Sequence, residues 1–211
     1  GPSGQATGLD LSAQMLEVAR RCDSAVEWLE GNAQALPFDD ACFDAVTCQQ
    51  GLQFFPDRAA AVREMRRVLV PGGRVAIAVW QGLETMPLFL ALHRVAEAHL
   101  GPLADARFGF GAAAQLESLL GEAGFAQVRV QTVERRIRFP DGAAYARINT
   151  QALVGMNPQA GGTRDEERFA LVARIAEASA PVLAAHADGP GAIADVAITH
   201  LASARVPQNW G

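Results

Sequence analysis

Short apolar runs alternate with amphipathic segments over the first two thirds of the chain. Four of these runs have the alternating or continuous apolar pattern of β-strands: residues 5–10, 26–30, 43–48 and 75–80. Residues 12–21 and 57–70 repeat their apolar side chains at helical spacing, and Ser12 and Asp57 stand at the positions of helix N-caps. A chain that alternates strands and helices in this way predicts a doubly wound α/β sheet.

Details of these segments make more specific predictions. The second helix ends before Pro71, because the residue that precedes a proline is pushed out of the α region. Residues 75–80 (VAIAVW) are nearly all apolar, which is typical of a parallel strand covered on both faces. Apolar side chains around the first helix are spaced to give one apolar face: Leu11, Met15, Val18, Ala19 and Cys22.

The remainder of the chain changes character. Residues 86–100 and 113–123 have helical patterns, residues 101–111 form a loop, and residues 125–139 resemble one long strand. Residues 153–162 are rich in glycine and contain Asn-Pro, so we expect a loop there.

A helix follows that loop. Thr163 and Glu166 have the spacing of a capping box, and Pro181 should kink or restart the helix that it opens. Its inward face is predicted to contain Phe169, Val172 and Ile175. Residues 193–206 form a last strand, and the simplest domain organisation is a single domain over residues 1–211 with a helical insertion.

Composition limits the classes of function. Half of the 211 residues are apolar, 19% are charged and the net charge is −5, as expected of a globular domain. This balance argues against binding to nucleic acid or to an anionic membrane. The 18 basic residues are all arginines, and two clusters lie in periodically apolar segments, where they predict solvated outer faces: Arg63/Arg66/Arg67 and Arg135/Arg136/Arg138.

Cysteine and histidine usage agrees with a cytoplasmic protein without a metal site. Cys22, Cys42 and Cys48 have no CxxC spacing and are odd in number, which favours free thiols. The four histidines lack metal-ligand spacing. Neither an apolar run of 18 residues nor a signal-peptide pattern at residues 1–4 is present, so we predict no membrane span and a cytoplasmic location.

Candidate chemistry lies just after the predicted strands, because ligands of open α/β sheets bind at the carboxyl ends of the strands. Asp10 suits a vicinal diol, since one carboxylate accepts hydrogen bonds from both hydroxyls of a ribose. Leu11 would then lie against adenine, with Asn32 and the N–H of Ala33 at its edge. Asp10 equally suits the positive end of the helix that begins after Ser12, so both interpretations remain open.

Four motifs in this order carry a family resemblance: residues 7–12 (TGLDLS), 31–38 (GNAQALPF), 43–57 (FDAVTCQQGLQFFPD) and 64–74 (EMRRVLVPGGR). Together they closely resemble class I S-adenosylmethionine-dependent methyltransferases, and in particular the small-molecule methyltransferases related to quinone-biosynthesis enzymes. The resemblance is dense over residues 1–80, whereas the rest of the chain matches only by pattern.

The resemblance implies roles for five residues toward S-adenosyl-L-methionine. By it, Asp10 binds the ribose, Leu11 packs on adenine, Asn32 and Ala33 hold the adenine edge, and Gln49 touches the methionine part. The family usually has aspartate where this chain has Asn32, whose amide oxygen can still accept from the adenine amino group. Residues 1–80 would be the cofactor-binding half, and residues 86–111 and 140–190 would cover the acceptor.

The resemblance also implies a Rossmann-like sheet of order 3-2-1-4-5-7-6 with an antiparallel last strand and a helical lid insertion. The family's first strand and glycine-rich loop are missing here, since residues 1–4 (GPSG) resemble the linker before the second strand. Strand 2 would then either close onto strand 4 or leave a gap that another chain fills, including self-association through the incomplete sheet. We therefore expect this chain to be poorly stable or inactive alone.

The predicted acceptor is a small apolar or aromatic molecule. Candidate pocket residues are Phe54, Phe55, Trp80, Met86, Phe89 and Phe108, although ordinary core packing also explains such side chains. Methyl transfer is an in-line displacement that depends on positioning, and we assign no catalytic residue.

Two other functions compete with methyl transfer. A nicotinamide-dependent oxidoreductase also places an acid after its second strand, but the chain has one tyrosine and no lysine for the Tyr/Lys pair of the short-chain form. A methyltransferase-like pseudoenzyme would act as a binding scaffold through its open sheet. Survival of four cofactor motifs favours the methyltransferase.

Overall fold

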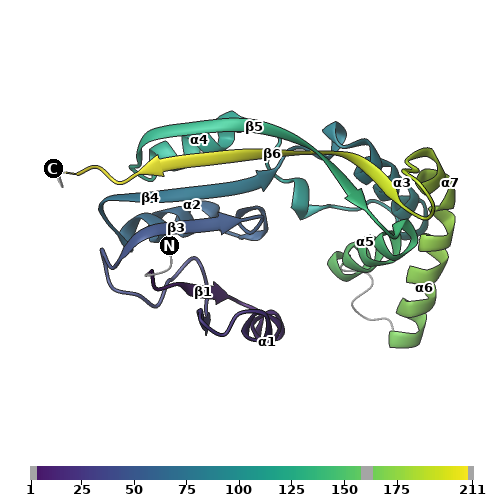
Figure 1. Ribbon diagram of the computed structural model, residues 1–211, viewed down its shortest axis with the longest axis horizontal. Coiled ribbons are helices and arrows are strands. Elements are labelled where there is room, and N and C mark those ends of the chain that lie inside the picture. The colour runs from purple at the N-terminus through teal and green to yellow at the C-terminus, as the bar shows by residue number, and fades with distance from the viewer. Residues whose placement is uncertain (1–3, 158–163, 209–211) are drawn as a thin grey trace. The chain divides into compact units, whose positions relative to one another are not determined.

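The computed structural model describes residues 4–157 and 164–208, and the chain divides into two compact units (Figure 1). The first unit comprises Gly1–Ala78, Ala113–Gln131 and Leu201–Gly211. The second comprises Val79–Ala112 and Thr132–His200. The division falls within three long strands, so each of these strands contributes residues to both units.

The first unit begins with a small parallel sheet. Strand β1 (Thr7–Asp10) pairs with β2 (Glu27–Glu30), from Thr7 opposite Glu27 to Asp10 opposite Glu30. Helix α1 (Ala13–Cys22) connects them, and the Ser12 hydroxyl oxygen accepts a hydrogen bond from the Met15 N–H at 3.3 Å. The predicted strand, capped helix and strand are thereby confirmed.

The predicted apolar face of α1 is wrong. Leu16 is the residue of this helix that is buried, whereas Leu11, Met15 and Val18 are 73%, 59% and 46% exposed. The helix packs on β1 and β2 through Leu16. Helical spacing alone does not decide which of two adjacent faces of α1 is buried. The rotation of the helix about its axis on the sheet determines this.

Close packing of β1 on β2 makes Gly8 sensitive to substitution. A β-carbon at position 8 would lie 2.2 Å from the Trp28 ring, which is held by a 2.9 Å hydrogen bond from its Nε1 to the Asp23 carbonyl. We expect Gly8→Ala to lower the free energy of unfolding by about 1–3 kcal/mol, because the ring must move. Gly121→Ala in α4 (Ala113–Glu122) is the control: its methyl group meets no atom within 4 Å, so stability should stay equal or rise. Urea denaturation of both variants checks this, and equal effects would contradict it.

A four-stranded sheet forms the rest of the strand structure, in the order β3-β4-β6-β5. The strands are β3 (Phe43–Gln49), β4 (Leu69–Trp80), β5 (Ala126–Phe139) and β6 (Ile193–Arg205). β3 and β4 are parallel. β6 runs against β4, since Gly72 bonds to Val206 whereas Gln81 bonds to Ile198, and the arrows in Figure 1 point in opposite directions. The predicted antiparallel last strand is confirmed.

The two sheets reproduce the predicted strand order around a gap. β2-β1 corresponds to strands 3-2, and β3-β4-β6-β5 corresponds to strands 4-5-7-6. Among the described residues β1 does not pair with β3, so strand 2 has not closed onto strand 4. A cleft of about 310 Å³ lies here within the first unit, lined by Thr7 and Leu9 of β1 and by Val46 and Cys48 of β3, among others.

One face of the four-stranded sheet is covered by α2 (Arg58–Arg67) and α4, which lie on the same side of it (Figure 1). Val75 and Ile77 of β4 are buried, whereas Ala76 between them is exposed. The prediction that residues 75–80 are covered on both faces is therefore wrong for the described part of the first unit. The strand also begins earlier than predicted, at Leu69, because a register irregularity between Phe43 and Ala45 accommodates the Pro-Gly-Gly turn within it.

The second unit is mainly helical. Its helices are α3 (Pro87–Leu100), α5 (Gly142–Met156), α6 (Asp165–Ala178) and α7 (Ala180–Ala185). Ala96, Leu153, Val154 and Ile175 form a core between α3, α5 and α6. The short turns are η1 (Leu52–Phe54) in the first unit and η2 (Leu83–Thr85) and η3 (Ala106–Phe108) in the second. Within the described ranges, no helix combines the length and apolar character needed to cross a membrane.

Predictions for the helical segments were partly wrong. The expected loop over residues 153–162 overlaps the end of α5, which was not predicted. Thr163 lies outside the described residues, and α6 begins after Arg164, which forms no side-chain cap. Phe169 is 68% exposed instead of facing inward. The predicted helix over residues 86–100 and the restart at Pro181 are confirmed.

Candidate functional site

The carboxyl ends of β1 and β2 bring the first predicted site residues together. The Gly31 N–H donates to the Asp10 carbonyl at 3.0 Å, so Asp10 lies beside the turn that carries Asn32. Asp10 is exposed, and its Oδ1 accepts from the Ser12 N–H at 2.8 Å. No hydrogen bond within the described ranges engages its Oδ2. One oxygen of the carboxylate therefore bonds at the start of α1, and the other remains available to a ligand. This geometry is compatible with both interpretations from the sequence, the helix-start acid and the ribose-binding acid.

Asn32 has a local structural role as well. Its Oδ1 accepts from the Gln34 N–H at 2.9 Å, and its carbonyl accepts from the Ala35 N–H at 3.0 Å. This turn leaves Asn32 exposed and Ala33 half-buried at the cleft beside β1. Leu11 presents an exposed apolar side chain next to the Asp10 carboxylate. Four of the five predicted cofactor residues thus gather at one end of the small sheet.

Gln49, the fifth, ends β3 in the same unit and is exposed. The next residue, Gln50, has a φ of 53°, and its N–H donates to the Ala78 carbonyl at 2.8 Å. Gln53 is 2% exposed and donates to the Gln50 side-chain oxygen at 3.2 Å. Non-glycine residues with positive φ are enriched in functional turns. Sequence reasoning considered Gln50 as a residue that follows the strand, but it missed the buried Gln53.

A second feature that sequence reasoning missed joins α2 to the turn after β2. Arg67, predicted to lie on a solvated face, instead forms a bidentate pair with Glu64 at 2.8 Å for both contacts. Hydrogen bonds from Arg67 and the peptide N–H of Leu36 hold the pKa of the Glu64 carboxyl below its usual range. The carboxylate is therefore ionised at neutral pH, and its stabilising contribution is lost only as pH falls through that lowered pKa.

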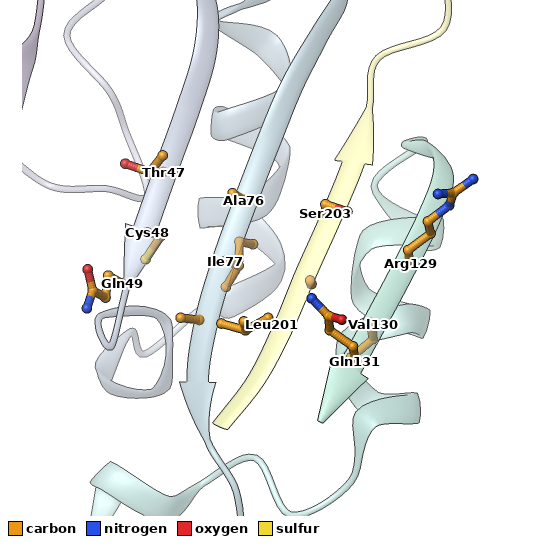
Figure 2. A pocket seen from close by; sticks show the side chains of 12 residues that line it. Thr47, Cys48, Gln49, Ala76, Ile77, Arg129, Val130, Gln131, Leu201 and Ser203 are labelled. Carbon is orange, nitrogen blue, oxygen red and sulfur yellow. The ribbon is translucent and has the colours of Figure 1, made fainter. Parts of the chain in front are cut away.

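A larger hollow of the first unit lies mostly away from these residues. It measures about 920 Å³ and lies on the uncovered face of the four-stranded sheet, where Figure 2 shows Thr47, Ala76 and Ser203 on three neighbouring strands. Of the predicted cofactor residues only Gln49 lines it. Ligands of open α/β sheets bind at the carboxyl ends of the strands and not on the face of the sheet. We therefore place the candidate site at the strand ends.

The predicted acceptor residues are distributed over both units. Phe54 is 47% exposed and Phe55 is half-buried in the first unit. In the second unit, Phe89 is the centre of an aromatic cluster, with ring centroids 6.3 Å from Trp80, 5.8 Å from Phe108 and 6.1 Å from Tyr145.

The two most buried candidates belong to the core. Met86 is fully buried and Phe89 is 8% exposed, whereas Trp80, Phe108 and Tyr145 are half-buried. Burial raises the pKa of the Tyr145 hydroxyl well above its usual range, so it remains protonated. In the second unit, the structure thus leaves the half-buried aromatic side chains as those that a ligand can reach.

A buried polar group adjoins this cluster. Arg107 forms a bidentate pair with Asp105, whose side chain is 3% exposed, and donates to the Asn149 oxygen at 2.8 Å. The guanidinium carbon also lies 5.3 Å from the centroid of the Phe108 ring. His93 Nδ1 is buried 3.8 Å from Asp105 Oδ2 and has no hydrogen-bond partner among the described residues. Sequence reasoning missed these residues, because their positions follow no recognisable motif.

Across the residues that the structure describes, no three His, Cys, Asp or Glu side chains lie close enough to hold a metal ion.

Comparison with known proteins gives these positions a context. Residues 1–77 match the family described as "Methyltransferase domain". The chain is 34% identical over 150 residues to a demethylmenaquinone methyltransferase of Staphylococcus aureus, a match that covers 63% of this chain and 62% of that relative's length.

Solved structures agree on the fold. The YcgJ protein of Bacillus subtilis has a TM-score of 0.60 at 19% identity, with 97% of this chain and 83% of that one covered. Phosphoethanolamine N-methyltransferase 2 of Haemonchus contortus, in complex with phosphomonomethylethanolamine and S-adenosylhomocysteine, has a TM-score of 0.51 at 18% identity, covering 97% and 44%. The α/β fold of class I methyltransferases predicted from the sequence is therefore confirmed.

Proposed function

We propose that this chain, whose residues 1–77 match the methyltransferase domain family, binds S-adenosyl-L-methionine and transfers its methyl group to a small acceptor. When bound, the cofactor supplies an electrophilic methyl carbon on a sulfonium. The chain's own residues have to hold the nucleoside, direct the methyl group and exclude water. The chain spans 62% of the length of the curated relative, so the activity is proposed from the site and from that likeness together.

The observation that carries the proposal is the pairing of Asp10 with Leu11. Asp10 keeps one carboxylate oxygen without a partner in the described structure, at the exposed end of β1, and the adjacent Leu11 side chain is 73% exposed. A charged acceptor beside an exposed apolar side chain fits a ribose diol joined to a flat base. The Asn32 turn, which the Gly31 N–H ties to Asp10, supplies groups for the edge of that base.

For the acceptor we propose an aromatic or quinone-like molecule. The half-buried aromatic side chains of the second unit, with Arg107 beside Phe108, suit a planar acceptor that carries an oxygen. The curated relative is named for a demethylated menaquinone, which belongs to this chemical class. We assign no general base.

The alternatives receive less support. Neither the family match nor the relatives described above point to a nicotinamide-dependent oxidoreductase. A scaffold without activity would keep the fold but would have no reason to keep an exposed leucine beside a free carboxylate oxygen. Cofactor binding separates these possibilities directly.

The test is calorimetric titration of the full chain with S-adenosylhomocysteine, beside a titration with NAD⁺. We expect binding of the first in the micromolar range and none of the second. Such binding would contradict the expectation, drawn from the missing first strand, that the chain is inactive alone. Transfer of a labelled methyl group to demethylmenaquinone would then extend the result to the acceptor. Binding of NAD⁺ alone would establish the oxidoreductase alternative, and binding of neither ligand would contradict the proposal.

A further inference from the structure

We propose that Glu64 and Arg67 of α2 are positioning residues that hold the adenine-binding turn in its binding conformation. This inference rests on the proposed function, because it assigns a purpose to the segment that follows Asn32. We call the pair and its contacts the α2 clasp. Its residues touch the turn and not the cofactor, so they act through the backbone of residues 31–40.

Every N–H of the Arg67 guanidinium has an acceptor. Nε and Nη2 bond to the two Glu64 oxygens, each at 2.8 Å. The remaining donors reach the Leu36 carbonyl at 3.0 Å, the Phe38 carbonyl at 2.8 Å and the Asp40 carboxylate at 2.7 Å. Arginine has five such donors in a rigid plane, and all five are used here. The geometry is thus specific to arginine.

Glu64 also bonds to the backbone of Leu36, the residue whose carbonyl Arg67 contacts. Its Oε2 accepts from the Leu36 N–H at 2.7 Å, while Arg67 donates to the Leu36 carbonyl. Both polar groups of one loop residue are therefore bonded to neighbouring side chains on one helix. The first turn of α2 adds a contact, since the Asp57 N–H donates to the Gln34 side-chain oxygen at 2.5 Å.

The turn depends on these bonds because it has no regular secondary structure of its own. Residues 31–42 lie between β2 and β3 and contain no helix or strand. Backbone hydrogen bonds from the N–H groups of Gly31, Ala41 and Cys42 tie the two ends of this segment to neighbouring elements, so its middle depends on side chains. The Asn32 turn directs the base-facing groups, and the clasp fixes the backbone four residues later. Loop groups that bind ligands gain affinity when their conformation is set beforehand.

The Glu64–Arg67 ion pair is partly shielded from solvent, so it can contribute to the stability of the turn. The side chains of Arg67 and Glu64 are 31% and 20% exposed, whereas that of Asp40 is 75% exposed. Exposed ion pairs contribute little, so Asp40 should be dispensable while Glu64 and the two carbonyls are not. Lysine in place of Arg67 keeps the charge but reaches fewer acceptors from a single nitrogen.

The experiment compares Arg67→Lys, Glu64→Gln and the control Arg63→Met, which removes an exposed arginine from the same helix. Each full-length variant is titrated with S-adenosylhomocysteine and with its inosine analogue, which lacks the adenine amino group. We expect the first two variants to lose about tenfold in affinity for the adenine ligand, and the preference over the inosine analogue to shrink. Arg63→Met should match the unmodified chain in both respects.

A second measurement does not depend on ligand. Amide hydrogen exchange should accelerate at residues 33–40 in Arg67→Lys and Glu64→Gln while β4 and α4 stay protected, and Arg63→Met should change nothing. Unchanged exchange in that segment would overturn the clasp. Faster exchange with unchanged ligand affinity and preference would also overturn it, because the turn would then be held for another reason. If the unmodified chain fails to bind S-adenosylhomocysteine, the proposed function fails, and exchange alone then decides whether α2 holds the turn.

Discussion

Replacing Asp10 by alanine is expected to weaken the binding of S-adenosylhomocysteine by about 100-fold, because two charge-assisted hydrogen bonds to the ribose are lost. The side chain is exposed and one of its oxygens bonds only to the Ser12 N–H, so the fold should tolerate the change apart from a weaker start of α1. Calorimetric titration of the variant measures the loss directly.

Two further variants distinguish the effect of the Asp10 charge on ligand binding from its hydrogen bond at the start of α1. Asp10→Asn retains an oxygen for the Ser12 N–H but lacks the charge and the second acceptor, so its affinity should fall nearly as far. Glu17→Gln removes an equal charge from the exposed side of α1 and should leave affinity unchanged. If Asp10→Asn bound like the unmodified chain, Asp10 would be a helix-start residue and the ribose assignment would be wrong.

Replacing Arg107 by methionine is expected to lower the free energy of unfolding by about 3–5 kcal/mol, because it leaves the Asp105 carboxylate buried without its partner. That carboxylate is 3% exposed, and Arg107 donates to both of its oxygens. The Asn149 side chain would lose a hydrogen bond at the same time. Urea denaturation followed by far-ultraviolet circular dichroism reports the change.

The matched control is Arg138→Met, which breaks an ion pair with Asp188. The Arg138 side chain is 52% exposed. Such a pair contributes about 0–1 kcal/mol, so this variant should remain close to the original stability. Adding Asp105→Asn to Arg107→Met should recover part of the loss, since no unpaired charge then remains buried. Equal destabilisation by both arginine variants would show that the Asp105 pair is not effectively buried.

The sequence predicted the first unit well because local signals there agree with one another. Ser12 and Asp57 each cap the helix that follows them, and the apolar alternation before Asp10 and at residues 43–48 matches β1 and β3. The strand order with its gap came from the family resemblance, since nothing in the periodicity of a strand tells which neighbour it pairs with.

What the sequence did not predict depends on contacts between distant residues. The half-buried position of Arg67 follows from carbonyls of Leu36 and Phe38, about thirty positions away, and the pattern of α2 treats it like the exposed Arg63. The exposure of Phe169 and of the Leu11 side of α1 likewise depends on what packs nearby. For the site, the residue types and their positions at strand ends could be predicted from the sequence. The hydrogen bond of Asn32 within its own turn and the positive φ of Gln50 could be seen only from the backbone conformation.

The separation of the two sheets has a thermodynamic consequence. Asp10 ends β1 and Asn32 lies in the turn after β2, whereas Gln49 ends a strand of the four-stranded sheet. All three belong to the first unit, yet no described strand hydrogen-bonds across the cleft between the two sheets. A nucleoside bound by Asp10, Asn32 and Gln49 would connect the two sheets. By mass action, such a ligand adds about 2.7 kcal/mol to stability at 100 times its dissociation constant. The folded population would then rise with the concentration of the ligand.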